Sequence, residues 1–428
     1  MKVISVTDPA AAAAGLRKAG GILSDSLIEE ARTIMKAVAD HGDSALLDYA
    51  AKFDGARPDS LRVTREEIDN AYSQVSKEQQ RAVKLMKDRL AKSELALLKR
   101  LKGISLSFEG VRIERQIKPI SSVGCYIPGG KARYPSTAVM CTVPAKLAGV
   151  KRIVAISPPR KDGTIDPLTL VAADMCGVDE FYKVGGAHGI AALAYGTQSV
   201  RPVSKIVGPG GSFVTAAKVV ASGSVSIDMV AGPTELLIYA DAAADTRIAA
   251  VDLVSQAEHG PDTVCGLVTT SDKVVAQVQS EVQSLLERIT RSDIVRSSLE
   301  QNGFLAVCRN ESDCVAFANE FAPEHLEIMS KNADRIAKKI ESAGLVLIGQ
   351  NTPSSASDYC LGSNHVLPTL GFGKSRASLS VLDFVKVVNK VKASRAGLKK
   401  IEQPVKEMAG AEGLLNHYEA VKARRDKE

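Results

Sequence analysis

Glu324 and His325 are neighbours in the chain and combine a carboxylate with an imidazole. Both groups can be tuned to exchange protons near neutral pH. Pro323 disfavours helix at the residue before it, so we expect a loop here that leads into a strand over 326–330. Neighbouring side chains point to opposite faces of a strand but can converge in a loop. The pair indicates acid–base chemistry, with two polar residues in a surface loop as the alternative.

Gln256 and His259 lie three residues apart at the end of an expected helix, which Gly260 and Pro261 terminate. Residues at this spacing share one helix face, and the negative end of the helix dipole favours a cation. An amide oxygen and an imidazole suit zinc or manganese when a carboxylate completes the site. The pattern therefore indicates part of a metal site, with a histidine that simply caps a helix end as the alternative.

Two further pairs of acid and imidazole stand nearer the C-terminus. Asp358 and His365 belong to a glycine-containing loop, which is either part of a site or a solvated polar turn. Glu412 and His417 are about 140° apart around an ideal helix, so they share no helix face. They reach one site only if the helix bends or begins near Gly413; otherwise the tail histidine is solvated.

Three glycine-rich turns follow expected strands, and each is a candidate ligand loop. Glycine lets the backbone approach a ligand, and the helix that follows offers free amides to phosphates. None of the turns matches G-x-G-x-x-G or a Walker A loop, so ordinary strand-to-helix turns are the alternative. The turns are Ile-Pro-Gly-Gly at 127–130, Gly-Gly-Ala-His-Gly at 185–189 and Gly-Pro-Gly-Gly-Ser at 208–212.

Composition favours a soluble globular protein. The 55 basic and 49 acidic residues leave a net charge of only +6, without the concentrated basic face of a nucleic-acid binder. The basic stretch over 81–102 has leucines at helical spacing, typical of a solvated helix face over a core, with a membrane-surface helix as the alternative. The seven cysteines are scattered without a C-x-x-C, and no apolar run suits a signal peptide or a membrane span. We therefore expect a cytoplasmic protein that binds neither nucleic acid nor membrane.

The elements that must position these residues follow an α/β pattern. The first hundred residues are predicted to be helical, with capping boxes at Thr64/Glu67 and Ser76/Gln79. Short apolar strands then alternate with helices, which is typical of βαβ units and a largely parallel sheet. One set has strands at 122–126, 152–157, 181–184 and 205–207, with helices at 136–149, 167–177 and 187–196. A second set has strands at 236–240, 264–270, 304–307, 326–330 and 345–348, and the tail ends in a helical stretch over 409–425.

Eight segments taken together resemble the histidinol dehydrogenase family. They stand in the family's order and cover nearly the whole chain, so the set is far more specific than any single piece. The segments are Gly-Cys-Tyr-Ile-Pro-Gly-Gly at 124–130, Ile-Ala-Ala-Leu-Ala-Tyr-Gly at 190–196, Ile-Val-Gly-Pro-Gly at 206–210, Ile-Asp-Met-Val-Ala-Gly-Pro-Thr-Glu at 227–235, Ser-Gln-Ala-Glu-His-Gly-Pro-Asp at 255–262, Ala-Pro-Glu-His-Leu at 322–326, Ser-Asn-His-Val-Leu-Pro-Thr at 363–369 and Glu-Gly-Leu-Leu-Asn-His at 412–417.

The resemblance implies two incomplete Rossmann-like parallel-sheet domains, a helical N-terminal segment and a C-terminal tail that is exchanged in a homodimer. We expect an N-terminal extension over 1–20 and a helical tail over 376–428 that reaches the partner subunit. The first α/β domain, formed by 21–118 and 232–375, is expected to carry most metal and catalytic residues. The second α/β domain, over 119–231, is expected to lie on the NAD side.

The resemblance also implies the chemistry. L-histidinol would be oxidised through an enzyme-held aldehyde to L-histidine, with two NAD used in turn, in histidine biosynthesis. Glu324 and His325 would be the acid–base residues. One Zn²⁺ per subunit would be held by Gln256, His259 and Asp358, with His417 supplied by the other subunit.

Substrate and cofactor contacts are implied in the same way. The residues expected to contact the substrate include the metal ligands: Thr234, Gln256, His259, His325, Asp358, His365, Glu412 and His417. The NAD surface would include Tyr126, His188 and Gly211.

The sequence departs from the family pattern at three of these positions. His188 stands where the family commonly has Gln, Gly211 where it has Asn, and Thr234 where it has Ser. The first two are implied NAD contacts. One alternative is a related zinc- and NAD-dependent dehydrogenase of another polar primary alcohol, such as the sulfopropanediol type. Another is a metal- or ligand-binding protein that has lost dehydrogenation.

Overall fold

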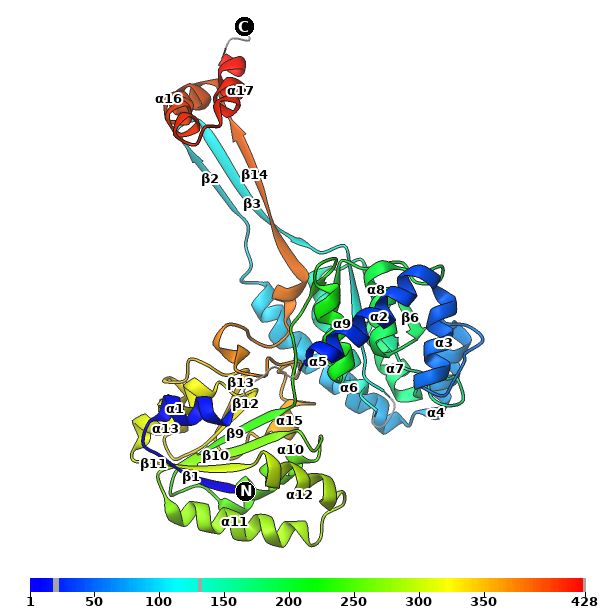
Figure 1. The fold of residues 1–428 in the computed structure, drawn as a ribbon, viewed down its shortest axis with the longest axis vertical. Coiled ribbons are helices and arrows are strands. Elements are labelled where there is room, and N and C mark those ends of the chain that lie inside the picture. Colours follow the sequence, from blue (N-terminus) through cyan, green and yellow to red (C-terminus); the bar gives the residue numbers. More distant parts are fainter. Residues whose placement is uncertain (18–22, 130–132, 426–428) are drawn as a thin grey trace.

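The computed structural model describes residues 1–17, 23–129 and 133–425, and it consists of two α/β bodies and a long projecting arm (Figure 1). The expected extension over 1–20 and the glycine loop at 127–130 each lie partly outside the described residues. Both predicted capping boxes, at Thr64/Glu67 and Ser76/Gln79, are confirmed. No described helix has the length and apolar character that crossing a membrane requires.

The first body is built on a parallel five-stranded sheet with the order β6-β5-β4-β7-β8. Successive residues of a strand face opposite sides of the sheet, so Ile153 and Ala155 join one core while Val154 and Ile156 join the other. Helices therefore cover both faces. The strands are β4 (Ser122–Tyr126), β5 (Arg152–Ser157), β6 (Glu180–Lys183), β7 (Lys205–Val207) and β8 (Ser226–Ile227).

The helices on the two faces come from either side of β4 in the sequence. One face carries α2 (Asp25–His41), α3 (Asp43–Phe53), α8 (Gly186–Tyr195) and α9 (Ser212–Ala221). The other face carries α4 (Arg65–Gln74), α5 (Lys77–Leu98), α6 (Pro135–Ala148) and α7 (Pro167–Cys176).

The second body is a parallel six-stranded sheet with the order β1-β11-β10-β9-β12-β13. Apart from the edge strand β1, its strand order repeats that of the first sheet. Its strands are β1 (Lys2–Val6), β9 (Glu235–Ala240), β10 (Val264–Thr269), β11 (Phe304–Cys308), β12 (His325–Met329) and β13 (Leu345–Ile348). The helices of this body are α1 (Pro9–Leu16), α10 (Thr246–Ala257), α11 (Asp272–Leu286), α12 (Ser292–Gln301), α13 (Glu311–Phe321), α14 (Ala333–Ala337) and α15 (Ser354–Ser357).

The N-terminal hundred residues differ from the sequence-based expectation in two ways. They begin with a strand, because β1 pairs with β11 at the sheet edge. The helices over 25–98 also pack on the five-stranded sheet, whereas the expected domain division groups 21–118 with 232–375. The cause is the apolar face of α2, where Ala31, Ile34 and Val38 share a core with α8 and α9. These helices therefore belong to the same body as residues 119–231.

The arm is an antiparallel sheet, β14-β3-β2, that the sequence patterns did not predict. Two helices stand at its far end, away from both bodies, as Figure 1 shows. Apolar side chains on the arm are exposed, among them Leu106, Phe108 and Val391. The arm elements are β2 (Ile104–Phe108), β3 (Val111–Pro119), β14 (Val385–Ala393), α16 (Arg395–Ala411) and α17 (Leu415–Arg425).

Candidate active site

A cavity of about 370 Å³ lies between the two bodies. From the first body it is lined by residues that follow β4 and β7, such as Pro128 and Gly208, which is the carboxyl edge of that sheet. From the second body it is lined by Thr234, Thr263 and Glu324, which come just before β9, β10 and β12. The cavity therefore joins the carboxyl edge of one parallel sheet to the amino edge of the other.

Glu324 and His325 converge in this cavity. The Glu324 carboxylate Oε2 lies 3.8 Å from Nδ1 of His325, and both side chains are buried. The turn before them makes this possible, because Ala322 adopts the left-handed conformation with φ of 46°. Glu324 is the last residue before β12, so the pair is not held to the alternation of a strand. The two side chains converge although His325 is already the first residue of β12, whereas the strand was expected to begin at 326.

The environment sets the protonation of this pair. Burial raises the pKa of Glu324 to about 7. Burial alone would lower the pKa of His325, but the carboxylates of Glu324 and Asp358 raise it to about 9. Nε2 of His325 lies 3.7 Å from Asp358, and neither ring nitrogen has a hydrogen-bond partner in the protein. The imidazole is thus held among carboxylates with both nitrogens free to meet a ligand.

Gln256, His259 and Asp358 line the same cavity. Gln256 is in the last turn of α10, and its Oε1 accepts a hydrogen bond of 3.3 Å from the Ser354 hydroxyl. Burial lowers the pKa of His259, which favours the neutral imidazole that metals bind. Burial alone would raise the pKa of Asp358, but His325 holds it below its ordinary value, so this side chain is a carboxylate.

These three donors fit a metal by their chemistry, although they do not complete a site. In the described part of the chain, no three His, Cys, Asp or Glu side chains are grouped so that they alone could hold a metal ion. The candidate set differs from such a group because one donor is the amide of Gln256. An amide oxygen, a neutral imidazole and a carboxylate leave room for a fourth ligand.

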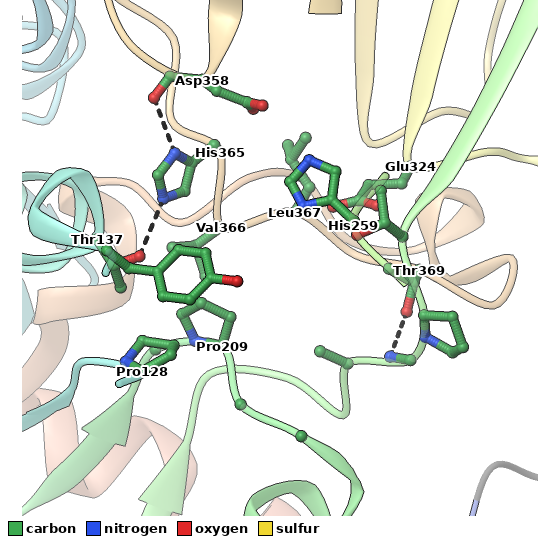
Figure 2. Close-up of a pocket in the computed structure, with 18 of the residues that line it drawn as sticks. Pro128, Thr137, Pro209, His259, Glu324, Asp358, His365, Val366, Leu367 and Thr369 are labelled. Atoms are coloured by element: carbon green, nitrogen blue, oxygen red, sulfur yellow. Dashed lines mark hydrogen bonds between the residues drawn. The ribbon is translucent and has the colours of Figure 1, made fainter. Parts of the chain in front are cut away.

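His365 is half-buried and lines the opposite wall of the cavity (Figure 2). Its Nδ1 donates to the backbone carbonyl of Asp358 at 2.9 Å, and its Nε2 lies 3.3 Å from the Thr137 hydroxyl. These bonds fix the ring and tie the loop that carries Asp358 to α6. On the facing wall, the Thr369 hydroxyl accepts a hydrogen bond of 2.6 Å from the amide of Gly232. Gly232 lies two residues before Thr234.

Of the residues implied for NAD, Gly211 lines the cavity, at the start of α9, but Tyr126 and His188 are not among its lining residues. His188 is buried against the rings of Tyr49 and Phe53, with Nε2 3.9 Å from Asp54. Burial lowers the pKa of His188 to about 4, so it is a neutral ring.

Glu412 and His417 are not brought to this cavity by their own chain. They belong to the end of α16 and to α17, at the far end of the arm in Figure 1. They face solvent there. The structure therefore leaves the two tail residues apart from the others. The candidate residues that it brings to the cavity are Gly211, Thr234, Gln256, His259, Glu324, His325, Asp358 and His365.

Some buried polar residues beside the cavity were missed by the sequence analysis. Lys218 pairs with Asp228, which accepts the Gly208 amide at 2.7 Å and so fixes the third glycine turn. Behind Gln256, Asp252 and Glu327 form a buried carboxyl pair. Burial and the Asp252 charge raise the pKa of Glu327 to about 8. No local pattern marks such pairs, because their partners are distant in sequence or belong to different elements.

Comparisons with known proteins identify the family. The family model for histidinol dehydrogenase matches residues 19–425. The histidinol dehydrogenase of Methanocaldococcus jannaschii is 40% identical over 94% of this chain and 93% of its own length. The histidinol dehydrogenase of Archaeoglobus fulgidus is 40% identical over 96% of this chain and 99% of its own length. The crystal structure of histidinol dehydrogenase from Elizabethkingia anophelis superposes with a TM-score of 0.92 and 35% identity, covering 99% of this chain and 98% of that one.

The chain therefore belongs to the histidinol dehydrogenase family, whose members are NAD-dependent oxidoreductases that act on a CH–OH group by way of an aldehyde.

Proposed function

We propose that this member of the histidinol dehydrogenase family oxidises L-histidinol to L-histidinal and then to L-histidine, with two NAD and a bound zinc ion. The observation that carries the proposal is the convergence of Glu324 and His325 in the cavity that Gln256, His259 and Asp358 also line. Acid–base residues and candidate metal donors thus face one volume large enough for a small amino alcohol.

The absent groups have simple roles. NAD, when bound, accepts a hydride in each oxidation. Zinc, when bound, orients the substrate through its nitrogen atoms. Gln256, His259 and Asp358 are the ligands we propose from this chain, and Gly211, Tyr126 and His188 are the proposed NAD-side residues. Since Tyr126 and His188 are buried, we propose that they shape the cofactor surface from beneath, through the Gly186 amide that donates to the Tyr126 hydroxyl.

The protein's own residues move the protons. The neutral form of the His325 imidazole, which is populated as the pH approaches its pKa of about 9, accepts the alcohol proton in the first oxidation. The Glu324 carboxylate takes a proton from water as the water oxygen adds to the aldehyde carbon. The protonated His325 returns its proton to the aldehyde oxygen, which gives the hydrate and leaves His325 neutral. His325 then accepts a hydroxyl proton of the hydrate in the second oxidation. Burial of both groups keeps bulk water from competing for these transfers.

The charge of the cavity favours a substrate that carries an imidazole and an amine. Among the described residues that line it, Lys218 is the one Lys or Arg side chain, and it is buried in an ion pair with Asp228. An anionic alcohol such as a sulfonate would need an unpaired cation. Glu324 and Asp358 instead offer negative charge to a cationic substrate, so the sulfopropanediol-type alternative is less well supported.

We further propose that the protein works as a homodimer in the cytoplasm, in which each arm carries Glu412 and His417 to the cavity of the partner. The apolar side chains exposed on the arm, among them Phe108 and Val391, support this proposal, because contact with a second subunit would bury them. The missing fourth metal ligand supports it as well. The seven free cysteines agree with a reducing compartment.

The direct test is an assay of the purified protein with L-histidinol and NAD. We expect two NADH for each histidine formed, loss of activity after treatment with a chelator, and recovery when zinc is added back. A panel of polar primary alcohols, including sulfopropanediol, serves as the control for specificity. Metal-replete protein that oxidises another alcohol but not histidinol would contradict the substrate, and protein that binds histidinol but never NAD would support the non-catalytic alternative.

A mixing experiment tests the exchange of the tail. His259→Ala and His417→Ala are each expected to be inactive alone. When the two variants are co-expressed, a mixed dimer has one cavity in which both histidines are intact. Random pairing should therefore restore about a quarter of the normal sites. If each chain used its own His417, the mixture would stay as inactive as the separate variants, and the exchange would be rejected.

A further inference from the structure

Arg17, at the end of α1, forms an ion pair with a buried carboxylate of the same body, that of Glu235. Its Nη1 donates to Glu235 Oε1 at 2.7 Å and its Nη2 to Glu235 Oε2 at 3.3 Å. The Glu235 side chain is only 3% exposed, and Arg17 is the charge that compensates it. A bidentate pair of this kind fixes orientation as well as charge.

The same guanidinium also holds the turn before the acid–base pair. Nη2 donates to the backbone carbonyls of Phe321 and Ala322, and the guanidinium carbon lies 4.4 Å from the centre of the Phe321 ring. Ala322 has φ of 46°, which is unfavourable for any residue except glycine. Such a conformation persists only where its surroundings over-determine it, and Arg17 is part of those surroundings.

Glu235 passes this constraint to Glu324. The Glu324 amide donates to Glu235 Oε2 at 3.3 Å, and the Glu235 amide donates to Glu324 Oε2 at 2.9 Å. The second bond fixes the carboxylate oxygen that lies 3.8 Å from His325. Each glutamate therefore holds the other, and Arg17 holds both through one of them.

Glu235 also holds a second turn beside the cavity. Its Oε1 accepts from the amide of Leu370, which has φ of 60° and follows Thr369. The two strained turns beside the cavity, at Ala322 and Leu370, are thus both attached to the Arg17–Glu235 pair. One ion pair between residues 218 positions apart braces both segments.

We propose that Arg17 is a positioning residue for Glu324 and His325, which acts by holding Glu235 and the turn at Ala322. It does not touch the substrate. The effect on catalysis rests on the proposed function, whereas the effect on local order does not. Removing Arg17 leaves Glu235 as an unpaired buried carboxylate. The double replacement should therefore lower the free energy of unfolding by less than the sum of the two single replacements.

The experiment compares Arg17→Met, Arg17→Lys, Glu235→Gln and the double variant Arg17→Met/Glu235→Gln. Lys374→Met is the matched control, because Lys374 forms an ion pair with Glu320 nearby but on the surface. We expect Arg17→Met to lower kcat for histidinol by about tenfold to a hundredfold, since small displacements of reacting groups have effects of this size. The KM for histidinol should change by less than about threefold, because the proposed metal ligands stay in place.

Arg17→Lys should recover part of kcat, since it restores the charge but not the bidentate contact. Hydrogen–deuterium exchange gives a readout without activity: Arg17→Met should raise exchange over 320–326 and 368–372 and leave the other segments of both sheets unchanged. Folded Arg17→Met with kcat within twofold of the parent and unchanged exchange in these two segments would overturn the proposal. A uniform rise of exchange over the whole chain, with no partial rescue by Lys, would overturn it in favour of a general structural role.

Failure of the proposed function gives a different pattern. In that case the parent protein shows no histidinol-dependent NADH formation, while the exchange measurement still decides whether Arg17 orders the two turns. Unchanged exchange then overturns the proposal by itself.

Discussion

Replacing His325 with Asn should lower kcat for histidinol and for histidinal by about 10²–10⁴-fold, the range typical of removing a general base. Both oxidations suffer because the proposed role of the imidazole recurs in each. Asn keeps a polar side chain between Glu324 and Asp358, each less than 4 Å from the imidazole, but cannot accept a proton. Steady-state rates with each substrate, measured separately, check this result.

Two comparisons make the His325 result specific. His41→Asn changes an exposed histidine at the end of α2 and should leave both rates unchanged. Histidinol should still bind to His325→Asn, because Gln256, His259 and Asp358 are intact, and calorimetry can measure this. If only one of the two oxidations slowed, a shared base at His325 would be excluded.

Replacing Glu324 with Gln should separate the two oxidations. We expect kcat for histidinal to fall by about 10²–10⁴-fold, since the proposed step lost is the activation of water. The first oxidation of histidinol should remain within about tenfold of the parent. Rapid mixing of the enzyme with histidinol and NAD should then show a burst near one NADH per site, followed by a very slow phase.

The pH dependence of the aldehyde step follows from the burial of Glu324. Burial raises the pKa of this carboxyl to about 7, so it stays protonated to a higher pH than an exposed glutamate. Only the ionised form can take a proton from water. The rate with histidinal should therefore rise with pH through about 7 rather than near 4.5, and rise again near 9, where His325 becomes neutral and can accept the proton of the hydrate.

The matched control for this variant is Glu320→Gln, which removes a half-exposed carboxylate on α13. It should leave the burst, the slow phase and the pH profile unchanged. A histidinal rate in Glu324→Gln that still rises through pH 7 would assign the titration to another group. His325 is the neighbouring candidate, because it faces Glu324 in the cavity, whereas the pKa of Asp358 is held below its ordinary value by His325.

Much of the fold followed from local patterns. The strands at 122–126, 152–157, 205–207 and 345–348 were predicted with the bounds that the structure has. Buried parallel strands are short, apolar and bounded by turns, so they are visible without partners. The strands of the arm were missed because none of their residues is buried, and their pairing joins residues near 115 to residues near 389.

The edge strand β1 and the placement of α2–α5 were missed for a related reason. A five-residue strand at the start of the chain has little pattern of its own, and it pairs with a strand far away in the sequence, where Lys2 lies opposite Phe304. The apolar face of α2 predicts that the helix is covered, but not by which sheet. Only packing against α8 and α9 decides that.

By itself the sequence determined which side chains are candidates for the chemistry. Three features can be recognised in the sequence without any structure. They are a carboxylate beside an imidazole, an amide and an imidazole at the end of one helix, and a set of motifs in a fixed order. The tertiary structure decided that these groups meet at the amino edge of one sheet, opposite the carboxyl edge of the other. It also decided that Arg17 braces Glu235 and Glu324, and that the chain does not bring its own His417 to the cavity. The physical reason is that spacing along a chain fixes only neighbours within a few residues, whereas burial and ion pairing join segments that the sequence holds far apart.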